Sequence, residues 1–167
     1  MAKETFVKKS EKLVFYGVDN DGSTTYYRMK GFSNLEKSDN PVEYSRTYVD
    51  EDMERSDVVG YAPAISASFD QIVGDEVHDD ILDIVDNETI GSGAVRTLMV
   101  VDLTKAAAGK AGSFEAYIRN YSVIGDSEGR DDLYNRSVNF KANGPIEKGT
   151  ATSSDEWATA TFTKATA

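Results

Sequence analysis

The sequence predicts a mainly β protein, a β-sandwich or barrel-like domain with one short amphipathic flanking helix and a long early loop. Apolar and polar residues alternate with a period of two over most of the chain, which is typical of half-buried strands. A single segment shows the spacing of an amphipathic helix instead. A chain of 167 residues is long enough to bury a real core and predicts a single domain over 1–167.

Eight segments have the composition or the alternation of strands. The segment 95–103 is almost entirely apolar, so we expect it to be the most buried strand. In segment 61–69, alternation places Tyr61, Ile65 and Phe69 on one face, opposite small residues. In chain order, the predicted strands are 13–18, 25–32, 43–48, 61–69, 95–103, 113–124, 138–142 and 157–163.

The predicted helix spans about residues 75–89. Asp75 follows a glycine and can cap the start of the helix, and Gly91 stands just past its end. A helix of this length must pack on a sheet to be stable. Its apolar stripe consists of Val77, Ile81, Ile84 and Val85.

The long early loop spans about residues 33–60 and is polar, yet it contains large apolar side chains. A loop of this length inside a compact domain is usually functional. Tyr and Met are enriched at protein interfaces. We therefore expect an inter-subunit contact through Tyr44, Tyr48, Met53 and Val58.

The net charge of −11 comes from two segments. Segment 33–59 is net −5 and segment 75–88 is net −7, so the rest of the chain is close to neutral. Such a surface repels phosphate backbones and argues against tight nucleic-acid binding. On the predicted helix, we expect Asp79, Asp80 and Asp83 to control the electrostatics of assembly.

Residue types exclude several classes of catalytic site. The chain has no cysteine and one histidine, so disulfides, thiolate chemistry and multi-histidine metal sites are ruled out. His78 lies among acids, but a lone histidine on an acidic helix is more often solvated than catalytic. We predict that the protein is not an enzyme and has no cofactor and no metal site.

Two loop motifs have simpler explanations than ligand binding. Segment 105–111 resembles a phosphate loop but lacks its first glycine and its final hydroxyl, so we expect a turn between strands. Segment 19–23 resembles the start of a calcium loop, but Asp21-Gly22 favours a tight hairpin. We also expect no signal peptide and no membrane-spanning segment, hence a soluble protein.

The order of these features resembles the major tail tube protein of long-tailed, non-contractile phages. The resemblance extends over most of the chain. It rests on three blocks: YAPAISASF at 61–69 leading into the acidic helix, RTLMVVD at 96–102, and VNFKANGPIEKGT at 138–150 followed by a Thr/Ala-rich strand.

This resemblance implies a structural virion protein rather than a catalyst. Subunits of the family form rings, typically hexameric, that stack into a tube through which DNA passes without specific binding. The long loop bridges neighbouring subunits. The implied partners are further copies of the chain and the tape measure, tail-tip and tail-terminator proteins, and the implied location is the virion tail after assembly in the host cytoplasm.

Two alternatives remain open from the residues alone. Nine tyrosines and Trp157 could provide stacking platforms for sugars, as in a monomeric carbohydrate-binding β-sandwich. A small hydrolase that uses paired carboxylates is the less favoured alternative.

Overall fold

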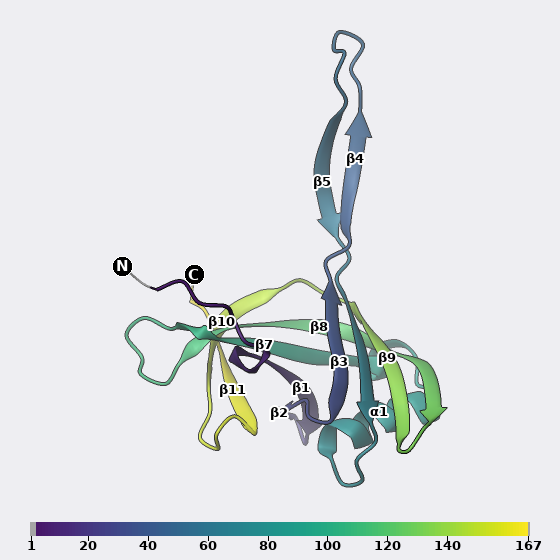
Figure 1. The fold of residues 1–167 in the computed structure, drawn as a ribbon, viewed down its shortest axis with the longest axis vertical. Coiled ribbons are helices and arrows are strands. Elements are labelled where there is room, and N and C mark those ends of the chain that lie inside the picture. Colours follow the sequence, from purple (N-terminus) through teal and green to yellow (C-terminus); the bar gives the residue numbers. More distant parts are fainter. Residues whose placement is uncertain (1–2, 167) are drawn as a thin grey trace.

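The computed structural model describes residues 3–166 and shows a mainly antiparallel β fold with one α-helix (Figure 1). Nine strands form one sheet in the order β10-β11-β2-β1-β7-β8-β9-β6-β3, and β4 pairs with β5 separately. The predicted fold class is confirmed. The elements are β1 (Lys12–Asn20), β2 (Ser23–Arg28), β3 (Phe32–Ser38), β4 (Pro41–Arg46), β5 (Arg55–Tyr61), β6 (Ala64–Asp70), α1 (Glu76–Asp86), β7 (Val95–Ala106), β8 (Phe114–Arg130), β9 (Tyr134–Ala142), β10 (Glu147–Thr152) and β11 (Thr159–Lys164), with 3-10 helices η1 (Lys9–Glu11) and η2 (Gly91–Ala94).

Part of the sheet closes into a barrel. Strand β10 pairs with β8 as well as with β11, so β1, β2, β11, β10, β8 and β7 form a complete ring of paired strands. Trp157 packs at the edge of this interior against Phe15 and Phe114, with ring centroids 6.2 Å and 5.7 Å away. The buried interior consists of Leu13, Phe15, Met99, Val101, Ala116, Ala151 and Ala160.

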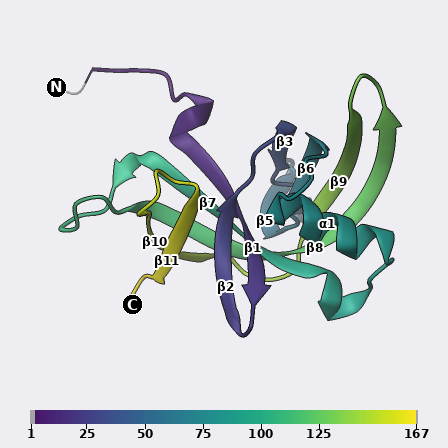
Figure 2. The same ribbon diagram turned by 90° about the horizontal axis from the view of Figure 1, so that it is seen from below.

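The remaining strands extend the sheet and enclose a second core. The first part of the long strand β8 pairs with β10 in the barrel, and its later part pairs with β9. Successive residues of β7 point to opposite faces, so Leu98 belongs to the second core whereas Met99 belongs to the barrel. Helix α1 closes this second core with Val77, Ile81 and Ile84. Seen from below, the helix lies across this end of the sheet (Figure 2).

The predicted helix start is confirmed and its end is earlier than expected. The Asp75 carboxylate accepts hydrogen bonds from the backbone N–H groups of Val77 (3.0 Å) and His78 (3.1 Å). The helix ends at Asp86, because Glu88 adopts a positive φ of 51° and turns the chain. Gly91 starts the 3-10 helix η2 rather than capping α1 directly.

The segment 33–60, expected to be a long loop, is mostly β-structure. Residues 33–38 belong to β3, the last strand of the main sheet, and the rest forms the β4–β5 hairpin. The predicted strand 43–48 overlaps β4, but β5 was not predicted, and both faces of the hairpin are largely exposed. Tyr61 ends β5 with an exposed side chain, so its predicted place on the core face beside Ile65 is wrong.

Two turns between strands agree with the sequence. Asp21 and Gly22 have φ values of 47° and 87° and join β1 to β2, as a tight hairpin requires. Residues 107–113 connect β7 to β8. Strand β10 was not predicted, because Glu147–Thr152 is polar and contains Gly149.

Candidate assembly interface

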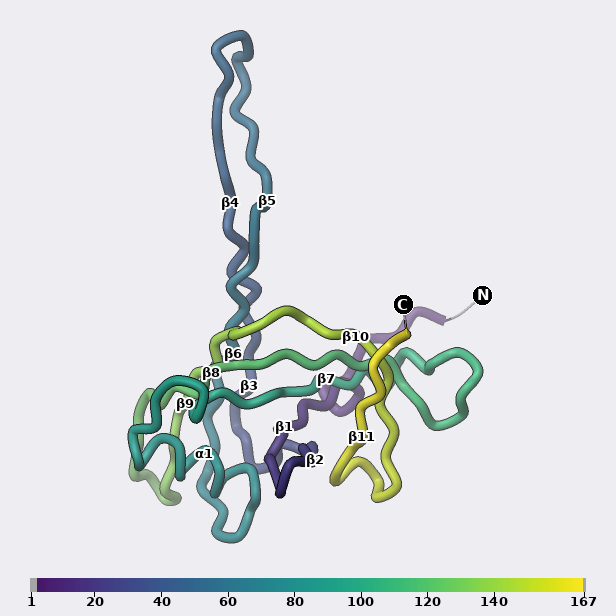
Figure 3. The backbone as a smooth tube through the Cα atoms, turned by 180° about the vertical axis from the view of Figure 1, so that it is seen from behind, coloured from purple at the N-terminus to yellow at the C-terminus, as the bar shows by residue number. Residues whose placement is uncertain are grey.

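The β4–β5 hairpin projects from the main sheet between β3 and β6. Figures 1 and 3 show from opposite sides that it stands clear of the body. Its base is tied by the N–H of Ala62, which donates to the carbonyl of Asn40 (3.1 Å), and by the Asn40 amide, which donates to the carbonyl of Ala62 (3.1 Å). The two strands are therefore anchored at one end only. Because an isolated two-stranded hairpin is at best marginally stable in water, such an element gains from a partner.

Apolar side chains concentrate on this hairpin. It holds eight of the sixteen large hydrophobic residues that are exposed within residues 3–166. At its tip, Val49 is fully exposed at 109% and Met53 is 77% exposed. Burying a side chain of this size stabilises a complex by about 1.5–3 kcal/mol. The eight residues are Val42, Tyr44, Tyr48, Val49, Met53, Val58, Val59 and Tyr61.

Arg46 organises the two tyrosines of the predicted contact. Its guanidinium lies over the rings of Tyr44 and Tyr48, 5.2 Å and 5.5 Å from their centroids. It also donates to the Tyr48 hydroxyl (3.1 Å) and pairs with Asp57. Our sequence reasoning missed Arg46, although the spacing Tyr44-x-Arg46-x-Tyr48 puts all three on one face of an extended chain. The other predicted contact residues, Met53 and Val58, lie apart from this cluster, at the tip and on β5.

The three predicted acids of α1 differ in environment. Asp80 is part of the packing: its carboxylate accepts hydrogen bonds from the Tyr16 hydroxyl (2.5 Å) and from Nε (2.9 Å) and Nη2 (3.3 Å) of Arg96. Burial and the neighbouring Asp80 carboxylate raise the pKa of Tyr16 well above its usual value. Asp79 and Asp83 are exposed, and Asp83 accepts a hydrogen bond from Asn87 (2.7 Å). Only Asp79 and Asp83 are free to act on a neighbour.

His78 is fully buried, so the expectation of a solvated side chain is wrong. Its ring stacks against Phe69 with centroids 4.4 Å apart and meets Phe32 edge-on at 5.4 Å. Nδ1 accepts a hydrogen bond from the N–H of Ile72 (3.0 Å), so the ring is neutral and Nε2 donates to the carbonyl of Lys30 (2.9 Å). Both nitrogens are satisfied by backbone groups, which gives His78 a structural role.

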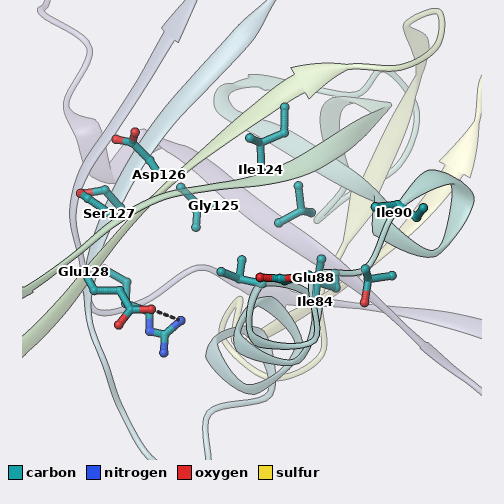
Figure 4. Close-up of a pocket in the computed structure, with 14 residues that line it drawn as sticks. Ile84, Glu88, Ile90, Ile124, Gly125, Asp126, Ser127 and Glu128 are labelled. Atoms are coloured by element: carbon teal, nitrogen blue, oxygen red, sulfur yellow. Dashed lines mark ion pairs between the residues drawn. The ribbon is translucent and has the colours of Figure 1, made fainter.

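A cleft of about 500 Å³ lies between the C-terminal end of α1 and strands β8 and β9 (Figure 4). Ile84, Ile90 and Ile124 supply its apolar wall. Arg136 pairs with Asp86 (2.9 Å) and with Glu128 (3.3 Å), so its charge is compensated. Within residues 3–166 there is no cluster of three or more side chains suited to binding a metal ion. Serine and threonine hydroxyls line the cleft, but within residues 3–166 none of them donates a hydrogen bond to a carboxylate.

Trp157, the tryptophan behind the carbohydrate alternative, is engaged internally, whereas Tyr44, Tyr48 and Tyr61 are exposed. Trp157 is half-buried against Phe15 and Phe114, so its ring does not stand free as a stacking platform. Asp19 accepts a hydrogen bond from the Thr24 hydroxyl (2.7 Å) across the β1–β2 turn.

Across the described residues, no helix is both long enough and apolar enough to cross a bilayer.

Comparisons with known proteins give similarity to solved structures but no match by sequence. A scan against protein-family models finds no match, and a search of curated proteins finds none either. Among solved structures, the chain is similar to the cryo-EM structure of the anti-feeding prophage cap, the cap that terminates its tube. The two chains share 12% sequence identity over 90% of this chain and 95% of that chain, with a TM-score of 0.49. At this level the similarity assigns no function to any residue here.

Proposed function

We propose that this protein is a structural subunit that polymerises into stacked rings and forms a phage tail tube. The observation that supports this most directly is the projecting β4–β5 hairpin, which exposes eight large apolar side chains. Contiguous exposed apolar surface on a soluble protein marks an interaction site. Tyr44, Tyr48, Met53 and Val58 are the proposed contact residues, with Arg46 holding the two tyrosines in place.

A free sheet edge supports the same proposal. The barrel strands have no edge, because β10 closes on β8. In contrast, β3 is the terminal strand of the sheet, and its outer side has no strand partner among the described residues. An unpaired edge is a template for adding a strand from another chain. A ring of copies pairs such edges, and a hexamer is the arrangement that the resemblance to tail tube proteins implies.

The proposed partners follow from the same resemblance. They are further copies of this chain together with tape measure, tail-tip and tail-terminator proteins, and the tube would carry DNA in a virion. The net charge of −11 suits a passage to which DNA does not adhere, because fixed acids repel phosphates. A structural role of this kind requires no cofactor and no catalytic group.

The experiment compares assembly of the full chain with that of matched apolar-to-polar variants. Val49→Ser/Met53→Ser changes the hairpin tip, and Ile90→Ser/Leu133→Ser changes two exposed residues on the body (87% and 63% exposed). We expect rings or tubes by sedimentation and negative-stain microscopy for the parent and the body variant, and loss of assembly for the tip variant. A parent that stays monomeric at high concentration, with or without tail-tip components, would contradict the proposal.

A further inference from the structure

A large hollow lies at the foot of the hairpin, away from α1. It is a groove of about 1010 Å³ lined by residues of β1, β3, β6, β7, β8 and β10 and by Lys9 of η1. Its wall includes the half-buried residues Val14, Leu35, Val100 and Tyr117 and reaches the buried Ile65. Ile65 belongs to the second core, and Val14 and Leu35 pack against it, so this core reaches the hollow. We call this hollow the lysine groove.

The groove is basic on a protein that is acidic overall. Five lysines and only three acids line it, although the whole chain has 18 basic and 29 acidic residues. Each acid pairs with one lysine, at 3.4 Å for Asp39, 3.9 Å for Asp102 and 4.0 Å for Glu115. Within residues 3–166, the other two lysines have no carboxylate within 4.0 Å. The paired lysines are Lys37, Lys12 and Lys105, and the uncompensated ones are Lys9 and Lys148.

The hairpin tip has the complementary character. Segment 47–54 contains Asp50, Glu51, Asp52 and Glu54 and no basic residue, so its net charge is −4. Between these acids lie the exposed side chains of Val49 and Met53. The acids of the tip complement the two uncompensated lysines of the groove, and the tip's exposed apolar side chains complement the apolar walls. The same chain thus contains a projecting element and a hollow of opposite charge.

We infer that the lysine groove receives the hairpin tip of a second copy of this chain. Val49 and Met53 would enter between the apolar walls, and the tip acids would face Lys9 and Lys148. This inference rests on the proposed self-assembly and adds the surface that accepts the hairpin. A nucleic acid is the less suitable occupant, because three of the five lysines are already paired and the chain as a whole has a net charge of −11.

The natural lack of cysteine allows a direct test by disulfide cross-linking. Full-length Asp52→Cys protein is mixed with full-length Lys148→Cys protein under assembly conditions and oxidised. We expect the heterodimer to form at least several-fold more than in the control mixture of Asp52→Cys with Asp132→Cys, whose second thiol lies in the β8–β9 turn. Assembly with cross-linking at the control level would refute the groove and leave the proposed function standing. Absence of assembly in every mixture would overturn both.

A charge exchange gives a second, independent test. Lys9→Glu/Lys148→Glu should weaken assembly about tenfold, and Asp50→Lys/Asp52→Lys should do so to a similar extent, because each removes two ion pairs. A chain with all four substitutions should regain most of the parental assembly. If it assembles no better than either double variant, the charged contact does not exist. Binding of a duplex DNA oligonucleotide that disappears in Lys9→Glu/Lys148→Glu, with assembly intact, would assign the groove to nucleic acid instead.

Discussion

Replacing Asp80 should damage the fold, whereas replacing the other two predicted acids of the helix should not. Asp80 and Arg96 are only 17% and 19% exposed, and the buried Tyr16 hydroxyl depends on the same carboxylate. In Asp80→Asn, the side-chain NH2 group replaces one carboxylate oxygen, so that a hydrogen-bond donor faces a donor of Tyr16 or Arg96. Hydrogen bonds to charged groups are worth about 1.5–3 kcal/mol each, and an unpaired partner adds its own desolvation cost. We expect a loss of about 3 kcal/mol in the free energy of unfolding.

This loss is large enough to measure by thermal unfolding. For a domain of this size, about 3 kcal/mol corresponds to a Tm lower by roughly 6–12 °C. Asp79→Asn and Asp83→Asn are the matched controls on the same helix, and each should remain within about 0.5 kcal/mol of the parent. A double-mutant cycle of Asp80→Asn with Arg96→Met should show a coupling of about 1 kcal/mol or more. An Asp80→Asn variant as stable as the two controls would refute the structural role of this carboxylate.

Three further predictions concern assembly, packing and acid stability. Added salt should speed assembly of the parent, followed by light scattering, because salt screens repulsion between acidic subunits. Asp79→Asn/Asp83→Asn should weaken this salt dependence, since it removes two exposed acids of the helix. An unchanged salt response in this variant would show that the two acids do not control the electrostatics of assembly. Gly149→Ala should lower Tm by several degrees, because a Cβ there would lie 2.1 Å from the carbonyl oxygen of Thr163; an unaltered melting curve would contradict this packing. Hydrogen bonds from the Thr159 side chain and backbone lower the pKa of Asp155 to about 2 from 3.8, so its stabilising contribution is complete above about pH 4 and is lost as the pH falls towards 2. Asp155→Asn should therefore flatten the decline of Tm between pH 4 and pH 2, and an identical decline in parent and variant would disprove it.

The sequence alone determined the elements whose burial imposes a pattern. Strand β6 alternates Ile65, Ala67 and Phe69 towards the core, and α1 turns Val77, Ile81 and Ile84 to the same core. The cap at Asp75 and the Asp21-Gly22 turn were also predictable, because each depends on local chemistry that neighbouring residues supply. Where one face of a strand or helix is buried and the other is exposed to solvent, the spacing of apolar residues in the sequence indicates the secondary structure.

The tertiary structure decided what depends on partners distant in the chain. The sequence predicted a strand over β4, but the pairing of β4 with β5 and the projection of the hairpin, whose faces are largely exposed, were not predicted. The roles of His78 and Asp80 were hidden because their partners lie far away: Lys30 and Phe69 for the imidazole, Tyr16 and Arg96 for the carboxylate. The lysine groove draws its residues from six strands and from η1, and closure of β10 on β8 helps to bring them to one place. Pairing between strands distant in the chain, which no local pattern encodes, created the hollow proposed to receive the hairpin.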